Sequence, residues 1–509
     1  MPLNSLFSWV IQKRVIQIER FKKKPLEVQH ELLFLLLKKA KNTWWGKKYN
    51  FNTIDSYNQF KQSLPLQTYT EVQPFIEKSI QGEENILWPG KTKWFAKSSG
   101  TTSFKSKFIP VTKDSLFKCH YKGGKDLLGI YYHTYPNRKL YNGKHLIIGG
   151  SAQINPIGFN SYLGDLSAII VKNLPFWAEV RRTPSRATTL LSNWEEKLEK
   201  MARETMHENV VIIAGVPSWT LVLCNKILEI TGKQYIDEVW PNLELFMHGG
   251  VSFHPYKSEF DRLMSKKQLN YIETYNASEG FFGIQDDPET EDLLLMLDYG
   301  IFYEFIPMRD YKGLESKHII ALDDVALNTN YALVVTTNGG LWRYIIGDTI
   351  QFTSLLPYKF KITGRTQSYI NAFGEEVIVD NAEKAIQKAS ELTKSQIQEF
   401  TAAPFFMGNK QRGGHEWIIE FTKIPEDLEQ FTAILDEALQ EINSDYEAKR
   451  QGDLALQKLI VHIAPKGTFN SWLKSNNKLG GQNKIPRLNN DRKILEEILT
   501  IIHTTSENA

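Results

Sequence analysis

The chain has 509 residues, too many for one hydrophobic core, so we expect two or three domains. Its 42% hydrophobic and 23% charged residues are typical of a globular protein. A formal net charge of +3 gives no support to nucleic-acid binding. Two cysteines, Cys119 and Cys224, exclude a disulfide framework and lack metal-ligand spacing, which fits a cytoplasmic protein.

Residues 9–25, WVIQKRVIQIERFKKKP, are basic and amphipathic. Binding to a membrane surface is conceivable, but we favour a helix that packs on the protein body with its Lys residues in solvent. The apolar run near Leu6 lacks the small-residue cleavage pattern of a signal peptide. The longest apolar stretch, VVIIAGVPSWTLVLC, is broken by Pro217 and is too short for a bilayer. We therefore expect no membrane partner.

Further along the chain, the pattern predicts an α/β protein. Residues 26–41 have the apolar spacing of an amphipathic helix with lysines at its C-terminal end. From residue 95 to about 360, short β-branched runs alternate with helical segments, which indicates α/β layers. The predicted strands are 144–150, 209–215, 331–337 and 341–348, and two predicted helices are 193–206 and 219–232.

The pattern changes at KFKITGRTQSYINAFGEEV, residues 359–377. Beyond it we predict a helix at 380–393, a strand at 415–422, a helix at 427–443 and a strand at 457–464. A Gly-rich basic tail and a last short helix follow. These elements indicate a compact α+β unit, so we place a domain boundary at Gly364 to Gln367, with domains 1–363 and 364–509.

The segment KSSGTTSFKSKFIPVT, residues 97–112, sets small hydroxylated residues around Gly100 with lysines beside them. Glycine permits backbone angles that other residues resist, so the backbone N–H groups of such a loop can converge. Converging N–H groups, hydroxyls and an ammonium form a cradle for anions, which suggests a polyphosphate site. The alternative is a polar surface loop, because Ser/Thr/Gly clusters are usually loops.

Two later segments have residues suited to a nucleotide. HGGVSFHPY at 248–256 has paired glycines after an apolar strand, where the backbone could approach a flat ligand closely; the alternative is a simple turn. TYNASEGFFG at 274–283 could place the Tyr275 ring on a base and the Glu279 carboxylate on Mg²⁺. The alternative there is a strand end with a solvated Glu. For His248 and His254 we favour structural roles.

LWRYIIGDTIQF at 341–352 predicts a strand that ends at Gly347 and presents Asp348 at its tip. A carboxylate there can accept two hydrogen bonds from a ribose diol, although a turn Asp is common. The aromatic-rich stretch IYYHTYPNRKLYNG at 130–143 could line a pocket for a ring-bearing acid. Core packing is the favoured interpretation, because aromatic residues dominate cores.

Taken together, these motifs resemble the GH3 acyl acid amido synthetases, a family of the adenylate-forming superfamily that includes luciferase and acyl-CoA ligases. The resemblance runs over nearly the whole chain. The matching positions are Ser98 to Lys107 in the first motif, Tyr275, Ser278 and Glu279 in the second, Tyr344, Gly347 and Asp348 in the third, Gly364 and Arg365 at the hinge, and Gly481, Lys484, Pro486 and Arg487 near the C-terminus.

Two positions depart from the family pattern. Phe104 stands where the first motif has Gly, so that part of the loop is expected to be wider or rotated. Ile345 stands where the third motif has Arg, while Arg343 lies two residues earlier. Strand alternation would put residues 343 and 345 on one face and 344, 346 and 348 on the other, which leaves the ribose side intact.

The resemblance implies a large N-terminal multi-layer α/β domain with a β-barrel part, and a smaller mobile C-terminal α+β domain that rotates about Arg365 to Gln367. It implies an ATP-dependent ligase that adenylates a small carboxylic acid and transfers the acyl group to the amine of an amino acid. Alternatives are an acyl-CoA synthetase of the same superfamily and a nucleotide-binding protein without chemistry. The acid, the amino acid, the base for the amine and the oligomeric state stay open.

The resemblance also implies site residues, with ATP and Mg²⁺ as the bound species. Lys107, Glu279 and Lys484 would be catalytic, with Glu279 also holding the metal and Lys484 stabilising charge on the α-phosphate and the attacking carboxylate. Nucleotide contacts would come from Ser98, Ser99, Gly100, Thr101 and Thr102 at the phosphates, from Gly249, Gly250, Val251 and Tyr275 around adenine, from Asp348 and Arg365 at the ribose, and from Ser278.

Overall fold

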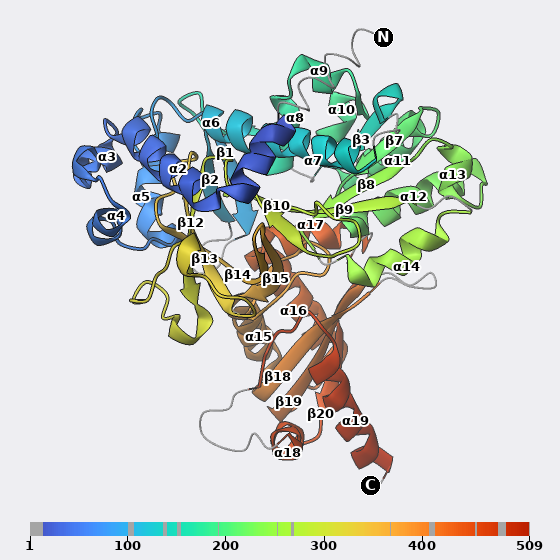
Figure 1. Cartoon of the computed structure of the whole chain (residues 1–509). Helices are drawn as coiled ribbons and strands as arrows, with labels where there is room; N and C mark the ends of the chain where they lie inside the picture. The colour runs from blue at the N-terminus through green and yellow to red at the C-terminus, as the bar shows by residue number, and fades with distance from the viewer. Residues whose placement is uncertain are drawn as a thin grey trace.

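The computed structural model describes residues 14–99, 106–135, 140–149, 154–191, 193–251, 253–265, 269–366, 368–406, 413–453, 456–476 and 485–507. Figure 1 shows a broad part formed by the blue to yellow segments and a narrower part, orange to red, that carries the C-terminus. The expected α/β class, with a large N-terminal and a smaller C-terminal part, is confirmed.

The first long helix, α2 (Pro25–Ala40), confirms the helix predicted over residues 26–41. Proline suits the first turn because its missing N–H would have no partner there. Lys38 and Lys39 lie in the last turn, where they oppose the negative end of the helix dipole. The helices α3 (Trp44–Lys48), α4 (Tyr57–Ser63) and α5 (Tyr69–Ile80) follow.

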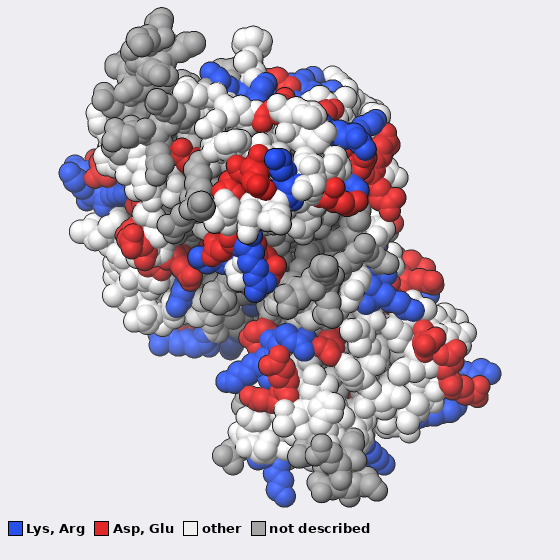
Figure 2. Space-filling model, turned by 90° about the vertical axis from the view of Figure 1, so that its right-hand side faces the viewer, with Lys and Arg blue, Asp and Glu red and all other residues white. Residues whose placement is uncertain are grey.

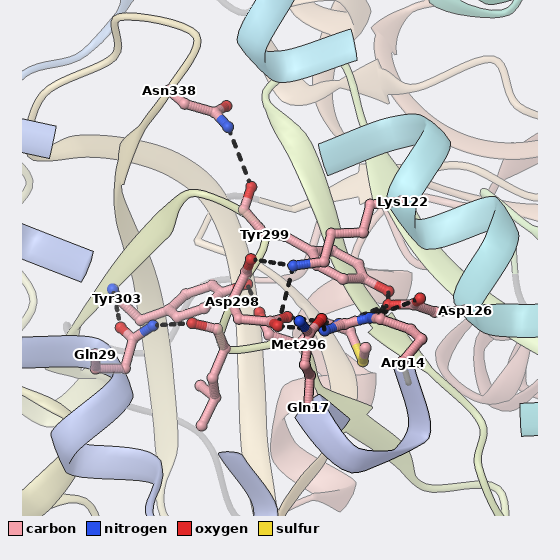
Figure 3. A network of polar contacts seen from close by, with 11 residues as sticks. Arg14, Gln17, Gln29, Lys122, Asp126, Met296, Asp298, Tyr299, Tyr303 and Asn338 are labelled. Atoms are coloured by element: carbon pink, nitrogen blue, oxygen red, sulfur yellow. Dashed lines mark hydrogen bonds and ion pairs between the residues drawn. The ribbon is translucent and has the colours of Figure 1, made fainter. Parts of the chain in front are cut away.

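The helix that ends before α2 is fixed by a partly buried polar network (Figure 3). Arg14 Nε donates to Asp126 Oδ1 at 2.8 Å, and Arg14 Nη2 donates to Asp298 Oδ1 at 2.7 Å. Lys122 lies 3.0 Å from Asp298, and the Tyr299 hydroxyl donates to Asp126 at 2.7 Å. Two cations thus face two carboxylates, so burial leaves no net charge. The predicted packing of this segment on the protein body is confirmed for its described residues.

The main sheet runs through the whole broad part of the molecule. Its strand order is β12 (Ile301–Pro307), β13 (Asn330–Thr337), β14 (Tyr344–Leu355), β15 (Tyr358–Arg365), β11 (Leu293–Leu295), β10 (Gly280–Ile284), β9 (Asn270–Ala277), β8 (Leu245–Gly249), β7 (Val210–Ala214), β3 (Lys144–Ile147) and β6 (Arg182–Thr183). From β9 to β6 the strands are parallel, and from β12 to β9 they are antiparallel. The strands predicted near residues 144, 209, 331 and 341 are confirmed as β3, β7, β13 and the start of β14.

Helices cover both faces of the parallel half, as Figure 1 shows. The helices of this part are α6 (Lys113–Ser115), α7 (Tyr121–Thr134), α8 (Leu166–Lys172), α9 (Phe176–Glu179), α10 (Arg186–Thr189), α11 (Trp194–Thr205), α12 (Pro217–Thr231), α13 (Ile236–Val239) and α14 (His254–Arg262). Ile212 and Leu245 pack with residues of α7, whereas Ile213 and Phe246 pack with residues of α11 and α12. Because successive side chains point to opposite faces, strands buried on both sides are continuously apolar.

A second sheet has the order β2 (Ser106–Val111), β1 (Trp94–Ser99), β5 (Tyr162–Asp165) and β4 (Asn155–Pro156). In its antiparallel pair β1 and β2, Ser99 faces Ser106 and Ser98 faces Lys107. The two ends of the predicted phosphate loop are therefore cross-strand partners, which fixes where the loop leaves and re-enters the sheet.

The predicted α+β elements follow β15 in the chain. They are β16 (Tyr369–Ile370), β17 (Val377–Ile378), α15 (Val379–Thr393), β18 (Gln396–Phe405), β19 (Gly414–Lys423), α16 (Leu428–Ile442), α17 (Ser444–Arg450), β20 (Ile460–Ala464), α18 (Thr468–Ser475) and α19 (Lys493–Glu507). The prediction missed β18, which forms the sheet β18–β19–β20, and the last helix has 15 residues where a short one was expected.

The two parts share one apolar cluster, which includes Phe246 from the main sheet and Phe373 and Trp417 from the C-terminal part. The Tyr256 hydroxyl donates to the Ala372 carbonyl at 2.6 Å across the same boundary.

In the part of the chain that the structure describes, no helix is long and apolar enough to cross a membrane. Figure 2 shows Lys and Arg interspersed with Asp and Glu over one face, in keeping with the net charge of +3.

Candidate active site

Three strands of the main sheet bring together a tyrosine, a carboxylate and a guanidinium. Tyr275 lies on β9, Asp348 on β14 and Arg365 at the end of β15. The Tyr275 hydroxyl donates to Asp348 Oδ2, and Arg365 Nε donates to Asp348 Oδ1 at 2.8 Å. Asp348 and Arg365 are also cross-strand partners. The predicted base-binding and ribose-binding residues are thus neighbours, although they lie 73 and 17 residues apart in sequence.

Asp348 reaches this position through a strand irregularity. The prediction that the strand ends at Gly347 is wrong, because β14 continues to Leu355. Ala332 faces Thr349 and Val334 faces Ile345, so four residues of β14 advance against two of β13. Gly347 has a φ of +99°, a backbone conformation that favours glycine. Side chains of residues 344–348 therefore do not simply alternate between the two faces of the sheet, and this bulge changes the direction of the Asp348 side chain.

Arg343 and Ile345, at the departure from the third family motif, have separate structural roles. Arg343 is buried and pairs with Glu304 at 2.9 Å, and it also donates to the Leu64 carbonyl at 2.6 Å. Ile345 packs in a small apolar cluster with Leu66 and neighbouring strand residues. Arg343 thus ties the N-terminal helices to the sheet, so it does not replace the Arg that the motif has at position 345.

Lys107 and Glu279 lie near this cluster and interact electrostatically with each other. Lys107 comes from β2, whereas Ser278 and Glu279 form the turn between β9 and β10; all three side chains are half-buried. Burial raises the pKa of Glu279 to about 7 against the opposing effect of the Lys107 ammonium. Burial lowers the pKa of Lys107 against the opposing effect of Glu279. Asp348 contributes to both shifts, so the three residues share one electrostatic environment.

Sequence reasoning missed two residues of this environment, Glu376 and Tyr369. Glu376 Oε2 accepts a hydrogen bond from Arg365 Nη1 at 3.3 Å, and the Arg365 guanidinium lies 5.4 Å from the Tyr369 ring centroid. Burial opposes the charge, but Glu376 and Asp348 hold the pKa of Arg365 well above its usual range. The available signal was their position just after the predicted hinge, on a segment that folds back over the end of β15.

The remaining predicted contacts are only partly described. Ser98 is half-buried on β1, and Ser99 ends that strand. Gly100, Thr101, Thr102, Phe104, Gln367 and Lys484 lie outside the described residues, as does the side chain of His254. Their predicted roles stay predictions.

The glycine pair at the end of β8 has a structural reason that sequence reasoning did not find. A Cβ on Gly249 would lie 2.3 Å from the Thr274 carbonyl oxygen, so glycine is required there for β8 to pack on β9. The Gly250 carbonyl accepts a hydrogen bond from Asn371 Nδ2 at 3.1 Å, and Val251 is buried. The predicted adenine segment therefore touches the C-terminal part of the chain. His248 is buried and its ring stacks on that of Phe253, with 4.0 Å between the ring centroids. This agrees with the structural role predicted for His248.

The carboxylates of the site suit a metal ion that binds together with the phosphates of a nucleotide. Among the described residues, no group of three or more His, Cys, Asp or Glu side chains could hold an ion. Mg²⁺ usually takes one or two carboxylates together with phosphate oxygens and water, so a single half-buried Glu279 is sufficient. Cys119 and Cys224 are both buried and unpaired, far from metal-ligand geometry.

Three family models match the chain: the GH3 family N-terminal domain over residues 14–269, the central domain over 294–365 and the C-terminal domain over 380–493. Among curated proteins, "Indole-3-acetic acid-amido synthetase GH3.4" of Arabidopsis thaliana is 22% identical, with 92% of this chain and 90% of the relative covered. "Jasmonoyl--L-amino acid synthetase JAR4" of Nicotiana attenuata is 23% identical, with 91% and 90% covered.

Solved structures show the same fold. The AtGH3.15 acyl acid amido synthetase in complex with 2,4-DB has a TM-score of 0.61 at 17% identity, with 96% of this chain and 95% of that chain covered. A 2-hydroxyisobutyryl-CoA ligase in complex with 2-HIB-AMP and CoA has a TM-score of 0.57 at 10% identity, with 94% and 92% covered. The first family model alone spans half of the sequence, so the chain belongs to the GH3 family.

Proposed function

We propose that this protein is an ATP-dependent acyl acid amido synthetase. A small carboxylic acid attacks the α-phosphate of ATP, giving an acyl-adenylate and pyrophosphate. The amine of an amino acid then attacks the acyl carbonyl, giving an amide and AMP. The observation that carries this proposal is the convergence of Tyr275, Asp348, Arg365, Lys107 and Glu279 in a GH3-family chain whose curated relatives are named as amido synthetases.

Asp348 is the proposed ribose ligand. Its two oxygens each accept one hydrogen bond within the protein, from Tyr275 and from Arg365. A carboxylate has about four lone-pair sites, so about two acceptor sites remain for the 2′- and 3′-hydroxyls. Arg365 holds the carboxylate in place through its hydrogen bond to Oδ1. Ser278, Gly249, Gly250 and Val251 would surround the adenine beside Tyr275.

Lys107 and Glu279 are the proposed phosphate and metal residues. Mg²⁺, when bound, neutralises charge on the leaving pyrophosphate. Glu279 would bind the ion through its carboxylate, and the Lys107 ammonium would pair with phosphate oxygens beside the loop Ser98 to Thr102. Because both groups are partly desolvated, their interactions with a polyanion are stronger than in water.

The C-terminal part, residues 364–509, is the proposed mobile domain, and Lys484 its catalytic contribution. An ammonium from this segment would stabilise the charge that grows on the α-phosphate as the acid attacks. Rotation about residues 365–367 would then exclude water from the acyl-adenylate. The hydrogen bond from Asn371 to the Gly250 carbonyl supports direct contact between this part and the adenine segment.

The test is an ATP–pyrophosphate exchange screen over aryl and alkyl carboxylic acids, followed by mass spectrometry with pooled amino acids and, separately, with CoA. We expect acid-dependent exchange and an amide product. Thioester formation without amide would favour the second candidate, an acyl-CoA ligase, whose fold is shared. Absence of exchange with every acid, while ATP still binds, would favour a nucleotide-binding protein without chemistry. A cytoplasmic location stays a prediction.

A further inference from the structure

A cavity of about 620 Å³ lies beside the first half of β9, outside the residues assigned to ATP. Its walls come from the end of α7, from β8 and β9, from α14 and from the loop after β10. Volumes of this size hold small organic molecules. Ile130, Tyr131 and Tyr135 of the aromatic-rich stretch line it, together with Phe253 and Tyr271. The favoured prediction for this stretch, core packing, is confirmed for Ile130 and Tyr131, which are buried in the core cluster and also border the cavity.

The charges of this cavity are predominantly negative. Its described lining residues include the carboxylates Glu273, Asp286, Glu289 and Glu291 and one ammonium, Lys257. Lys257 already pairs with Asp261 at 3.0 Å. Asp286 pairs with Lys22 at 2.8 Å and with Lys359 at 2.9 Å, so it is neutralised from outside the cavity. The glutamates therefore dominate, and they disfavour a carboxylic acid in this space.

Of the three glutamates that line the cavity, Glu273 is the interior one. It is half-buried, whereas Glu289 and Glu291 are exposed at the rim. Within the described part of the chain, the Glu273 carboxyl has neither a hydrogen-bond donor nor a cation beside it; only its backbone is bonded, to Gln285. A desolvated carboxyl without a partner gains most from an incoming ammonium.

The histidine in the cavity wall adds no positive charge. His248 is 3% exposed and lines the cavity. Burial lowers the pKa of His248 to about 3, so the imidazole is neutral and does not repel a cation.

We propose that this cavity is a binding site for an organic amine, with its ammonium at Glu273 and its apolar or aromatic body among Tyr131, Tyr271 and Phe253. Aromatic walls favour both the body of such a ligand and its cationic end. This site is distinct from the proposed ATP site and does not depend on the ligase function.

The test uses the full chain without ATP and isothermal titration calorimetry with tyramine. Its matched probes are 4-ethylphenol, which lacks the amine, and 4-hydroxyphenylpropionate, which carries the opposite charge. We expect tyramine to bind and both other probes to bind at least about 10-fold more weakly, since a charge-assisted hydrogen bond is lost. Equal binding of 4-ethylphenol, tighter binding of the acid, or no tyramine binding would each overturn the proposal.

Substitutions locate the site. Glu273→Gln should weaken tyramine binding by about 10-fold or more, and Glu291→Gln at the rim should weaken it by a smaller factor. The matched control is Glu259→Gln on α14, because Glu259 pairs with Arg262 at 2.6 Å and does not line the cavity. Its tyramine affinity should equal that of the unmodified chain. Unchanged affinity in both cavity variants, or an equal loss in the control, would refute the assignment.

Discussion

Replacing Asp348 with Asn removes the charge of the proposed ribose ligand and keeps its shape. In the folded protein Asp348 accepts hydrogen bonds from Arg365 at one oxygen and from Tyr275 at the other. An Asn amide can still accept from Arg365 with its oxygen, and its NH₂ can donate to the Tyr275 hydroxyl. The local packing should therefore persist, which makes the variant a test of ligand binding rather than of folding.

The expected magnitude follows from the remaining acceptor sites. The carboxylate offers about two free lone-pair sites to the ribose diol, whereas the amide offers about one, and its second N–H points at the other hydroxyl. One charge-assisted hydrogen bond is thus lost, at about 1.5–3 kcal/mol. That range corresponds to about a 10- to 150-fold weaker affinity for ATP.

The assay is calorimetric titration of ATP with Mg²⁺ into the Asp348→Asn variant and into a control, Asp310→Asn. Asp310 is also a hydrogen-bonded aspartate, with Oδ2 2.7 Å from His318 Nδ1, but it lies on the surface. Circular dichroism should show the same fold in both. ATP affinity equal to that of the unmodified chain in the Asp348 variant, or an equal loss in the control, would refute the ribose assignment.

Three further outcomes are expected. Arg343→Met leaves Glu304 buried without its cation, so the free energy of unfolding should fall by about 3–5 kcal/mol in urea titrations, with ATP affinity unchanged; the reverse pattern would assign Arg343 to the ligand. Burial raises the pKa of Glu279 to about 7, and Mg²⁺ requires the ionised carboxylate. Binding of Mg²⁺ with ATP should therefore release about one proton at pH 6 and almost none at pH 8.5, as measured by calorimetry in buffers of different ionisation enthalpy. The same proton release from the Glu279→Gln variant would contradict this. Lys484→Ala should slow acyl-adenylate formation by about 100-fold or more with the fold intact, and unchanged pyrophosphate exchange would remove Lys484 from the mechanism.

Local pattern predicted most of the elements that frame the site. The helix over 26–41 and the strand over 209–215 were confirmed because apolar spacing reports directly which faces are buried. The motif order along the chain also predicted which residues to examine. Glu376 and Tyr369 were missed because their position after the hinge does not by itself predict that this segment contacts Arg365.

The sequence by itself determined the α/β class, the family and the chemical types of the proposed site residues. Only the tertiary structure decided that Gly249 serves strand packing, that Arg343 anchors helices, and that a bulge aims Asp348 at Tyr275. The physical reason is range: propensity and periodicity act between near neighbours, whereas these contacts depend on how strands far apart in sequence register against one another. The cavity beside Glu273 has the same origin, since its walls come from five separate segments.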